Sequence, residues 1–360
     1  IKWEGEVLKI DNCDLNPVTL NMTLVRNIRS SVLLIGPMLA RFGKVSLGTP
    51  GGCLIGARPL DAHLEALKEI GVSVEYDAAS DMYELKAPSP RKLRNKVVLT
   101  EFSVTATENL MMLGTAMPSL EIELAAAEPH IQDLGRFLEK LGFVLGGLGT
   151  HNIRIFGSKD VPTAGTYHTI MPDPIEAGTF MVLGALAAES LSIRNVPVTF
   201  MTSPIKKLQE FGVDLKILKE TVIVKNSLKN LKGTKIQTLP YPGFPTDLQA
   251  PYGVLATQSD GPSLIFDTLY EGRLRYIYEL QKMGARAEIL DDHRAVVHGP
   301  TTLHGAEIKS LDLRAGATLV IAALIAEGRS TLDGAETIDR GYARLEERLR
   351  LLGAEIERIK

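Results

Sequence analysis

The chain has 360 residues, of which 45% are hydrophobic and 23% are charged, and its formal net charge at pH 7 is −3. A chain of this length exceeds the size at which one hydrophobic core keeps growing, so two domains are expected. The small net charge argues against nucleic acid as a partner, and no apolar run of about 18 residues predicts a membrane-spanning helix. Two cysteines and no secretory signal favour the cytoplasm over a disulfide-bonded secreted fold.

The first predicted element is a strand over residues 5–10, GEVLKI. Five later segments then repeat one pattern, an amphipathic helix that ends at glycine and is followed by a strand alternating apolar and polar residues. They are residues 64–76, 134–147, 205–218, 277–290 and 345–358. Their glycines, Gly71, Gly142, Gly212, Gly284 and Gly353, recur every 69 to 72 residues. We expect each glycine to adopt the left-handed conformation that ends a helix.

A second kind of helix lies between these segments and is rich in small and apolar residues on all sides. Examples begin at Thr105, Ile175 and Leu313, and this composition is typical of a helix buried within a domain. With the intervening strands, the repeat is a β-α-β-α-β-β unit of about 70 residues. The opening strand resembles the end of such a unit, which predicts that a segment of roughly 60 residues precedes it. A stretch with two prolines, residues 167–178, predicts a boundary between domains at 1–171 and 172–360.

The loop TPGGCLIGARPLDAH, residues 49–63, is the first candidate site. Glycines let a loop bend or approach a ligand closely, and the guanidinium of Arg58 would lower the pKa of the Cys53 thiol. No His–Asp partner pattern of a cysteine protease accompanies it, so acid catalysis and covalent catalysis both remain open for Cys53. Cys13 lies between Asn12 and Asp14, whose charge disfavours a thiolate, and is expected to be less reactive.

Several arginines lie at the starts of predicted elements, next to Gly, Ser or Asp: Arg29, Arg314 and Arg340. Singly, each suits a surface or capping role, but together they would form an anion site for carboxylate and phosphate. Asp247 in GFPTDLQAP and Asp312 in LDLRAG fit either a helix N-cap or a group that accepts a substrate hydroxyl. The seven histidines have no metal-ligand spacing, and we expect neither a metal nor an organic cofactor.

These motifs together resemble one family of enolpyruvyl transferases, the UDP-N-acetylglucosamine 1-carboxyvinyltransferases. PGGCLIGARP, SVTATE from Ser103, FPTDLQA, DLRAGA and IDRGY occur in the order and spacing of that family, and the resemblance spans essentially the whole chain. It implies two inverse α/β barrel-like domains, each of three β-α-β-α-β-β units, with the active site in the cleft between them. It also implies transfer of the enolpyruvyl group of phosphoenolpyruvate to the 3-hydroxyl of UDP-N-acetylglucosamine, without nucleic acid or membrane partners, by a monomer or weak oligomer.

The resemblance also implies roles for individual residues. Cys53 corresponds to the proton donor, which is the target of fosfomycin in this family, and Asp247 to the base for the sugar hydroxyl. Arg340, here counted as catalytic, joins Arg58 and Arg314 in holding the phosphoenolpyruvate anion. The remaining substrate-binding positions are Arg29, Pro59, Leu60, Asp61, Ser103, Val104, Leu269, Arg273 and Asp312.

The sequence departs from the family pattern at Thr105, where glycine is commoner, at Gly272, where asparagine is usual, and at Pro174, where arginine is frequent. The family's N-terminal Lys-Asn pair would lie in the expected preceding segment. Two alternatives stay open from the residues. One is 5-enolpyruvylshikimate-3-phosphate synthase, which shares the fold but lacks the PGGC loop. The other is a UDP-sugar-binding relative without catalytic activity.

Overall fold

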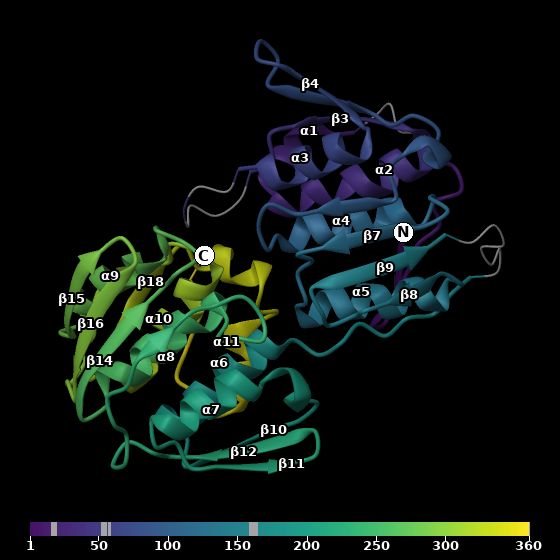
Figure 1. The fold of residues 1–360 in the computed structure, drawn as a ribbon. Helices are drawn as coiled ribbons and strands as arrows, with labels where there is room; N and C mark the ends of the chain where they lie inside the picture. The colour runs from purple at the N-terminus through teal and green to yellow at the C-terminus, as the bar shows by residue number, and fades with distance from the viewer. Residues whose placement is uncertain (16–19, 52–55, 57–58, 158–164, 360) are drawn as a thin grey trace. The chain divides into compact units, whose positions relative to one another are not determined.

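The computed structural model describes residues 1–15, 20–51, 56, 59–157 and 165–359 (Figure 1). The chain divides into two compact units: unit 1 takes in most of residues 1–168, and unit 2 is built mainly from residues 169–360. Among the described residues, no helix is both long and apolar enough to cross a membrane.

Among the described residues, the predicted β-α-β-α-β-β unit is seen once in full in each half of the chain. In unit 1 it comprises β6 (Lys96–Val98), α4 (Val104–Gly114), β7 (Leu120–Glu123), α5 (Pro129–Lys140), β8 (Val144–Gly146) and β9 (Asn152–Phe156). In unit 2 it comprises β13 (Ile236–Gln237), α8 (Gln249–Thr257), β14 (Gly261–Phe266), α9 (Tyr276–Lys282), β15 (Arg286–Asp291) and β16 (Arg294–Gly299). The strand orders, β6-β7-β9-β8 and β13-β14-β16-β15, are equivalent, with a parallel first pair and antiparallel neighbours.

The other sheets have two or three strands. Unit 1 also contains the antiparallel pair β1 (Lys2–Glu4) and β2 (Val7–Lys9), and the sheet β3 (Lys44–Gly48), β5 (Met82–Lys86) and β4 (Ser73–Asp77). Its further helices are α1 (Met22–Asn27), η1 (Arg29–Leu34), α2 (Ile35–Phe42), α3 (Asp61–Ile70) and η2 (Pro90–Lys92). Pairing of β1 with β2 confirms the predicted opening strand.

Unit 2 adds the sheet β10 (Ser190–Ile193), β12 (Thr221–Lys225) and β11 (Leu215–Leu218), and the parallel pair β17 (Glu307–Lys309) and β18 (Thr331–Asp333). Its further α-helices are α6 (Pro174–Ala187), α7 (Thr202–Glu210), α10 (Leu313–Ile325) and α11 (Leu345–Leu351). Its short 3-10 helices are η3 (Val198–Phe200), η4 (Thr246–Leu248), η5 (Arg273–Arg275) and η6 (Ala335–Arg340).

The five repeat glycines end their helices as predicted. Each has a positive φ, between 88° and 104°, which glycine adopts without the steric cost that a Cβ would bring. Four are followed by the expected strand, namely β4, β8, β11 and β15. The fifth prediction was wrong, because residues 354–359 form no strand after Gly353. A strand needs a hydrogen-bonding neighbour, and no described strand pairs with this segment, although Ala354 and Ile356 pack against the core.

The helices rich in small residues are buried, as their composition predicts. All of residues 177–186 of α6, all of α8 and residues 315–322 of α10 are buried. In unit 2 these three helices contact one another, and Figure 1 shows them beside the strands of that unit. Asp247 lies in the turn before α8, and Asp312 and Arg314 lie at the N-terminal end of α10. These are acidic and basic residues that the sequence predicted for the site.

Candidate active site

Asp247 lies in η4, the single turn of 3-10 helix that precedes α8. No side chain caps this turn, so Asp247 is not the helix cap that one interpretation of the sequence allowed. Its carboxylate instead accepts hydrogen bonds from two arginines: Oδ1 from Nη1 of Arg273 at 2.5 Å, and Oδ2 from Nε of Arg314 at 3.2 Å. Three predicted site residues, distant in sequence, are therefore in direct contact.

Both arginine side chains are largely buried, with 10% of Arg273 and 14% of Arg314 exposed. The guanidinium of Arg273 lies over the ring of Tyr270, and that of Arg314 over the ring of Tyr342, each 5.3 Å from the ring centroid. Within the described part of the chain, Nη1 of Arg314 and Nε of Arg273 are buried donors without a hydrogen-bond partner. Unpaired buried donors of this kind are costly, and an anionic ligand would satisfy them.

The charges in this cluster fix the protonation of its members. Burial by itself would raise the pKa of Asp247, but the neighbouring Arg273 and Arg314 outweigh it and hold that pKa well below its ordinary value. The carboxylate in turn raises the pKa of both arginines against the effect of their burial. Asp247 is thus an ionised acceptor, and a weak base while both arginines contact it.

Asp312 performs the capping role that its sequence position allowed. Its Oδ1 accepts the backbone N–H groups of Arg314 at 2.8 Å and Ala315 at 2.9 Å, at the start of α10. This cap fixes the first turn of the helix from which Arg314 reaches Asp247. A direct contact of Asp312 with substrate remains a prediction.

Arg340 ends η6 and is exposed, in the IDRGY segment that packs on α10. A Cβ on the next residue, Gly341, would come within 2.4 Å of Cδ1 of Leu313, so this glycine lets the segment pack closely against the first turn of α10, next to Arg314. Tyr342, which follows, is fully buried, and its hydroxyl is 2.8 Å from Oγ1 of Thr179. Tyr342 belongs to the IDRGY motif, but no role was assigned to it from the sequence; its ring lies under Arg314.

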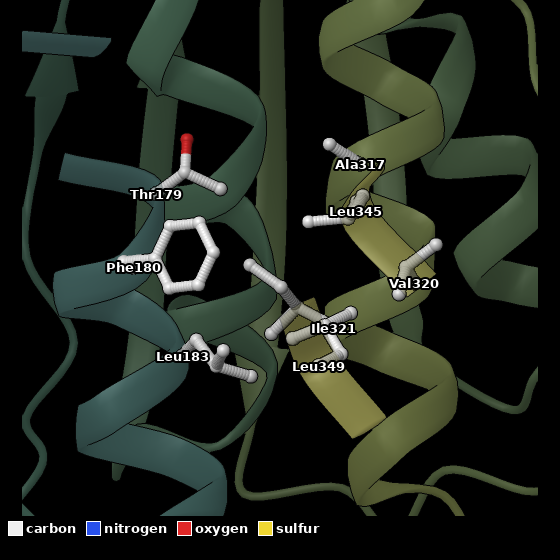
Figure 2. Close-up of a pocket in the computed structure, with 8 residues that line it drawn as sticks. All are labelled: Thr179, Phe180, Leu183, Ala317, Val320, Ile321, Leu345 and Leu349. Atoms are coloured by element: carbon white, nitrogen blue, oxygen red, sulfur yellow. The ribbon is translucent and has the colours of Figure 1, made fainter. Parts of the chain in front are cut away.

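The apolar hollow in Figure 2 lies between α6, α10 and α11. Thr179 is the one polar residue that lines it, and its hydroxyl is engaged with Tyr342 and with the carbonyl of Ile175. This hollow offers no group for an anion, in contrast to the arginine cluster.

In unit 1, predicted nucleotide-binding residues lie at the N-terminal ends of α3 and α4. Leu60, which is buried, precedes α3, and Asp61 is its first residue. The exposed Pro59 accepts a hydrogen bond on its carbonyl from Nη2 of Arg29, at 3.0 Å. Ser103 caps α4 through Oγ, and Val104 is the first residue of that helix. A capped helix N-terminus presents N–H donors to anions.

His63, the last residue of the first candidate loop, to which no role was assigned from the sequence, joins these two helices. His63 is 3% exposed, and its Nε2 lies 2.7 Å from Oγ1 of Thr105. Burial, with a contribution from the charge of Arg29, lowers the pKa of His63 to about 4, so the ring is neutral at pH 7. The Thr105 hydroxyl is therefore engaged with α3 inside unit 1.

Comparison with known proteins assigns the family. A family model described as EPSP synthase (3-phosphoshikimate 1-carboxyvinyltransferase) matches residues 2–349. UDP-N-acetylglucosamine 1-carboxyvinyltransferase 1 of Caldanaerobacter subterraneus is 43% identical over 366 aligned residues, covering 99% of this chain and 86% of the relative. UDP-N-acetylglucosamine 1-carboxyvinyltransferase 2 of Bacillus subtilis is 40% identical, covering 99% and 82%. The chain belongs to the UDP-N-acetylglucosamine 1-carboxyvinyltransferases.

Solved structures confirm the α/β fold of enolpyruvyl transferases for this carboxyvinyltransferase. The enolpyruvyl transferase NikO from Streptomyces tendae matches with a TM-score of 0.81 and 25% identity, covering 94% of this chain and 79% of that one. EPSP synthase from Acinetobacter baumannii matches with a TM-score of 0.66 and 19% identity, covering 90% and 77%. The second likeness concerns the fold alone.

Two residues to which the family resemblance gives roles, Cys53 and Arg58, lie outside the described residues, so their roles stay predictions. Cys13 is described and exposed. A hydrogen bond to the Asp11 side chain, aided by its charge, raises the pKa of the Cys13 thiol. This agrees in direction with the predicted low reactivity, although the responsible carboxylate is Asp11 and not Asp14.

Two departures from the family pattern have plain structural settings. Pro174 is the first residue of α6, capped by Asp173, where proline fits well. Gly272 has φ −96°, which any residue can adopt, so the backbone does not require glycine there. Within the described ranges, no group of three or more His, Cys, Asp or Glu side chains could hold a metal ion.

Proposed function

We propose that this carboxyvinyltransferase moves the enolpyruvyl group of phosphoenolpyruvate to the 3-hydroxyl of UDP-N-acetylglucosamine and releases phosphate. The reaction would open peptidoglycan precursor synthesis in the cytoplasm. The observation that supports it most is Asp247 held between two buried arginines, because it combines an acceptor for a hydroxyl with donors for an anion. The two relatives described above, which are 43% and 40% identical to this chain, are both named as UDP-N-acetylglucosamine 1-carboxyvinyltransferases, and this supports the proposal.

The proposed reaction has an addition and an elimination. In the addition, the sugar oxygen bonds to C2 of phosphoenolpyruvate, its proton passes to Asp247, and Cys53 gives a proton to the methylene carbon C3. In the elimination, C3 returns a proton to the Cys53 thiolate, the bond from C2 to the phosphate oxygen breaks, the departing phosphate takes the proton from Asp247, and the double bond re-forms. The products are the enolpyruvyl ether and inorganic phosphate, and the acid and base return to their starting states.

The arginines would hold the phosphoenolpyruvate anion. Arg314 is suited to this because its buried Nη1 has no partner in the described residues while Nε contacts Asp247. Arg58 and Arg340 are proposed to complete the anion site, on the strength of the family resemblance. Planar guanidinium groups bind carboxylate and phosphate through paired, charge-assisted hydrogen bonds.

The electrostatics suggest when Asp247 becomes a base. While Arg273 and Arg314 contact it, its low pKa makes proton uptake unfavourable. A phosphoenolpyruvate anion that takes over part of the hydrogen bonding of Arg314 would raise the Asp247 pKa toward its ordinary value. Substrate binding would then activate the base only when the group it attacks is present.

The rest of the proposal concerns the nucleotide and the fold. We propose that UDP-N-acetylglucosamine contacts Arg29, Arg58–Asp61, Ser103, Val104 and Leu269, and that its diphosphate faces the N-terminus of α4.

The two halves of the chain, 1–171 and 172–360, would each be an inverse α/β barrel-like domain. Buried α6, α8 and α10, in contact with one another and with strands of unit 2, support this arrangement.

Phosphate release tests the reaction directly. We expect release only when phosphoenolpyruvate and UDP-N-acetylglucosamine are both present, and none when shikimate 3-phosphate replaces the nucleotide. Binding of UDP-N-acetylglucosamine without phosphate release would instead indicate a non-catalytic relative. Release with shikimate 3-phosphate would contradict the proposed substrate.

Cysteine variants test the proton donor separately. Cys53→Asp should keep some activity, because a carboxylic acid can also donate a proton, whereas Cys53→Ala should have none. Iodoacetamide should label Cys53 before Cys13, whose thiol pKa is raised by Asp11. Full activity of Cys53→Ala, or first labelling at Cys13 in a peptide map, would reject the assignment.

A further inference from the structure

Asp267 is a fully buried carboxylate to which neither the sequence motifs nor the proposed reaction gives a role. It directly follows β14, and its two oxygens accept four hydrogen bonds. Oδ1 accepts from the hydroxyl of Thr238 at 3.1 Å and from the N–H groups of Leu269 at 3.0 Å and Tyr270 at 3.1 Å. Oδ2 accepts from the hydroxyl of Thr246 at 2.6 Å.

The bond to Thr246 sets the direction of a chain of hydrogen bonds. A hydroxyl has one proton, and Thr246 donates it to Asp267, so only lone pairs of Oγ1 are left for other groups. Nη1 of Arg273 donates to that oxygen at 3.1 Å, and the same Nη1 donates to Asp247 at 2.5 Å. The chain therefore runs from Asp247 through Arg273 and Thr246 to Asp267.

Asp267 also holds the backbone from which Arg273 extends. Its Oδ1 fixes the turn at Leu269 and Tyr270, and the ring of Tyr270 lies under the Arg273 guanidinium. Arg273 is thus held at both ends, at the loop before η5 and at Nη1. This holds the guanidinium in place even though its buried Nε has no partner among the described residues.

We propose that Asp267, acting through Thr246, is a positioning residue that aims Nη1 of Arg273 at Asp247. The inference rests on the proposed function, in which Asp247 receives the sugar proton. Without the Thr246 oxygen, the guanidinium loses one of the two acceptors that fix Nη1. Its distance to Asp247, and so the basicity of that carboxylate during the reaction, would then vary.

Two threonines provide a matched experiment. Thr246 and Thr238 each donate a hydroxyl to Asp267, but only Thr246 also accepts from Arg273. We expect Thr246→Val to lower kcat for phosphate release about 10-fold or more, with KM for UDP-N-acetylglucosamine changed less than about twofold. Thr246→Ser should restore kcat, and Thr238→Val should change it less than about twofold. Equal losses of kcat in the two valine variants would overturn the proposal.

Thermal unfolding separates this proposal from the proposed function. The Tm losses of Thr246→Val and Arg273→Met should be non-additive when combined, whereas those of Thr238→Val and Arg273→Met should add. This readout needs no turnover. A wild-type protein that releases no phosphate would reject the proposed function alone, while additive losses for Thr246→Val and Arg273→Met would reject the positioning role alone.

Discussion

The N-termini of the buried helices α4, α6, α8 and α10 are built in two ways. Ser103, Asp173 and Asp312 cap α4, α6 and α10 with side-chain hydrogen bonds to backbone N–H groups. At α8 a 3-10 turn without a side-chain cap takes that place, and Asp247 there bonds two arginines instead.

The difference shows that an acidic residue before a buried helix can bond either the backbone of that helix or side chains from other elements. Asp312 contributes its oxygen to the backbone and thereby fixes Arg314. Asp247 makes no capping bond to its own helix, so its ionised oxygens bond side chains and, in the proposed reaction, would accept the sugar proton. Releasing a carboxylate from capping gives up an interaction of about 1 kcal/mol, which the arginine contacts offset.

The largest expected effect comes from removing the cation that joins the two helix ends. Arg314→Gln should lower kcat/KM for phosphoenolpyruvate by about 10³-fold, because it loses charge-assisted bonds to the substrate and the contact with Asp247. The control is Arg294→Gln. Arg294 on β16 forms an exposed ion pair with Asp291 on β15, and its substitution should have little effect on kcat/KM. Steady-state kinetics that placed the two variants within a few-fold of each other would remove Arg314 from the anion site.

A smaller effect is expected in the pH dependence of stability. The pKa of Asp247 is below its ordinary value of 3.8 in the folded state, so the ionised carboxylate stabilises the fold above that pH and the stabilisation is lost as the pH falls further. The stability advantage of the wild type over Asp247→Asn should be constant from pH 7 to 5. Below 3.8 it should shrink by up to about 1.4 kcal/mol per pH unit, measured by denaturant unfolding. An advantage unchanged down to pH 3 would contradict the arginine contacts.

The smallest effect on substrate binding is expected at the capped end of α4. Thr105→Gly should lower stability by about 1–3 kcal/mol, because glycine weakens a helix and buried Nε2 of His63 loses its partner. The same change should alter KM for UDP-N-acetylglucosamine less than about threefold, since the hydroxyl bonds His63. Thr105→Ser, which keeps the hydroxyl, is the control. A larger improvement in KM with glycine would show that Thr105 crowds the diphosphate.

Much of the fold could be predicted from the sequence, because it depends on local patterns. Glycine is the residue that favours the positive φ found at these helix ends, and a helix made of small and apolar residues favours burial, so both features can be recognised in the sequence. The prediction of a strand after Gly353 was wrong because a strand forms only beside a hydrogen-bonding neighbour, and an alternating sequence pattern does not show whether that neighbour exists.

The candidate site was predictable only in part. Asp247, Arg273 and Arg314 belong to segments that resemble the family, but nothing local to Asp247 distinguished its role from capping. No role was predicted for Asp267, Tyr342 or His63, since their importance arises from contacts across 20 or more residues. Asp267 is followed by an ordinary turn sequence, and its four donors become apparent only in the folded chain.

The central claim is that Asp247 is the base of the proposed reaction whereas the carboxylate of Asp312 caps α10, and one pair of variants tests it. Asparagine keeps the shape of both side chains and is a good helix cap, so Asp312→Asn should keep turnover within about threefold of wild type. Asp247→Asn should bind UDP-N-acetylglucosamine nearly as wild type but lower kcat for phosphate release about 10²-fold or more, the usual size of a general-base contribution. Near-normal turnover of Asp247→Asn, or equal losses in both variants, would contradict the account.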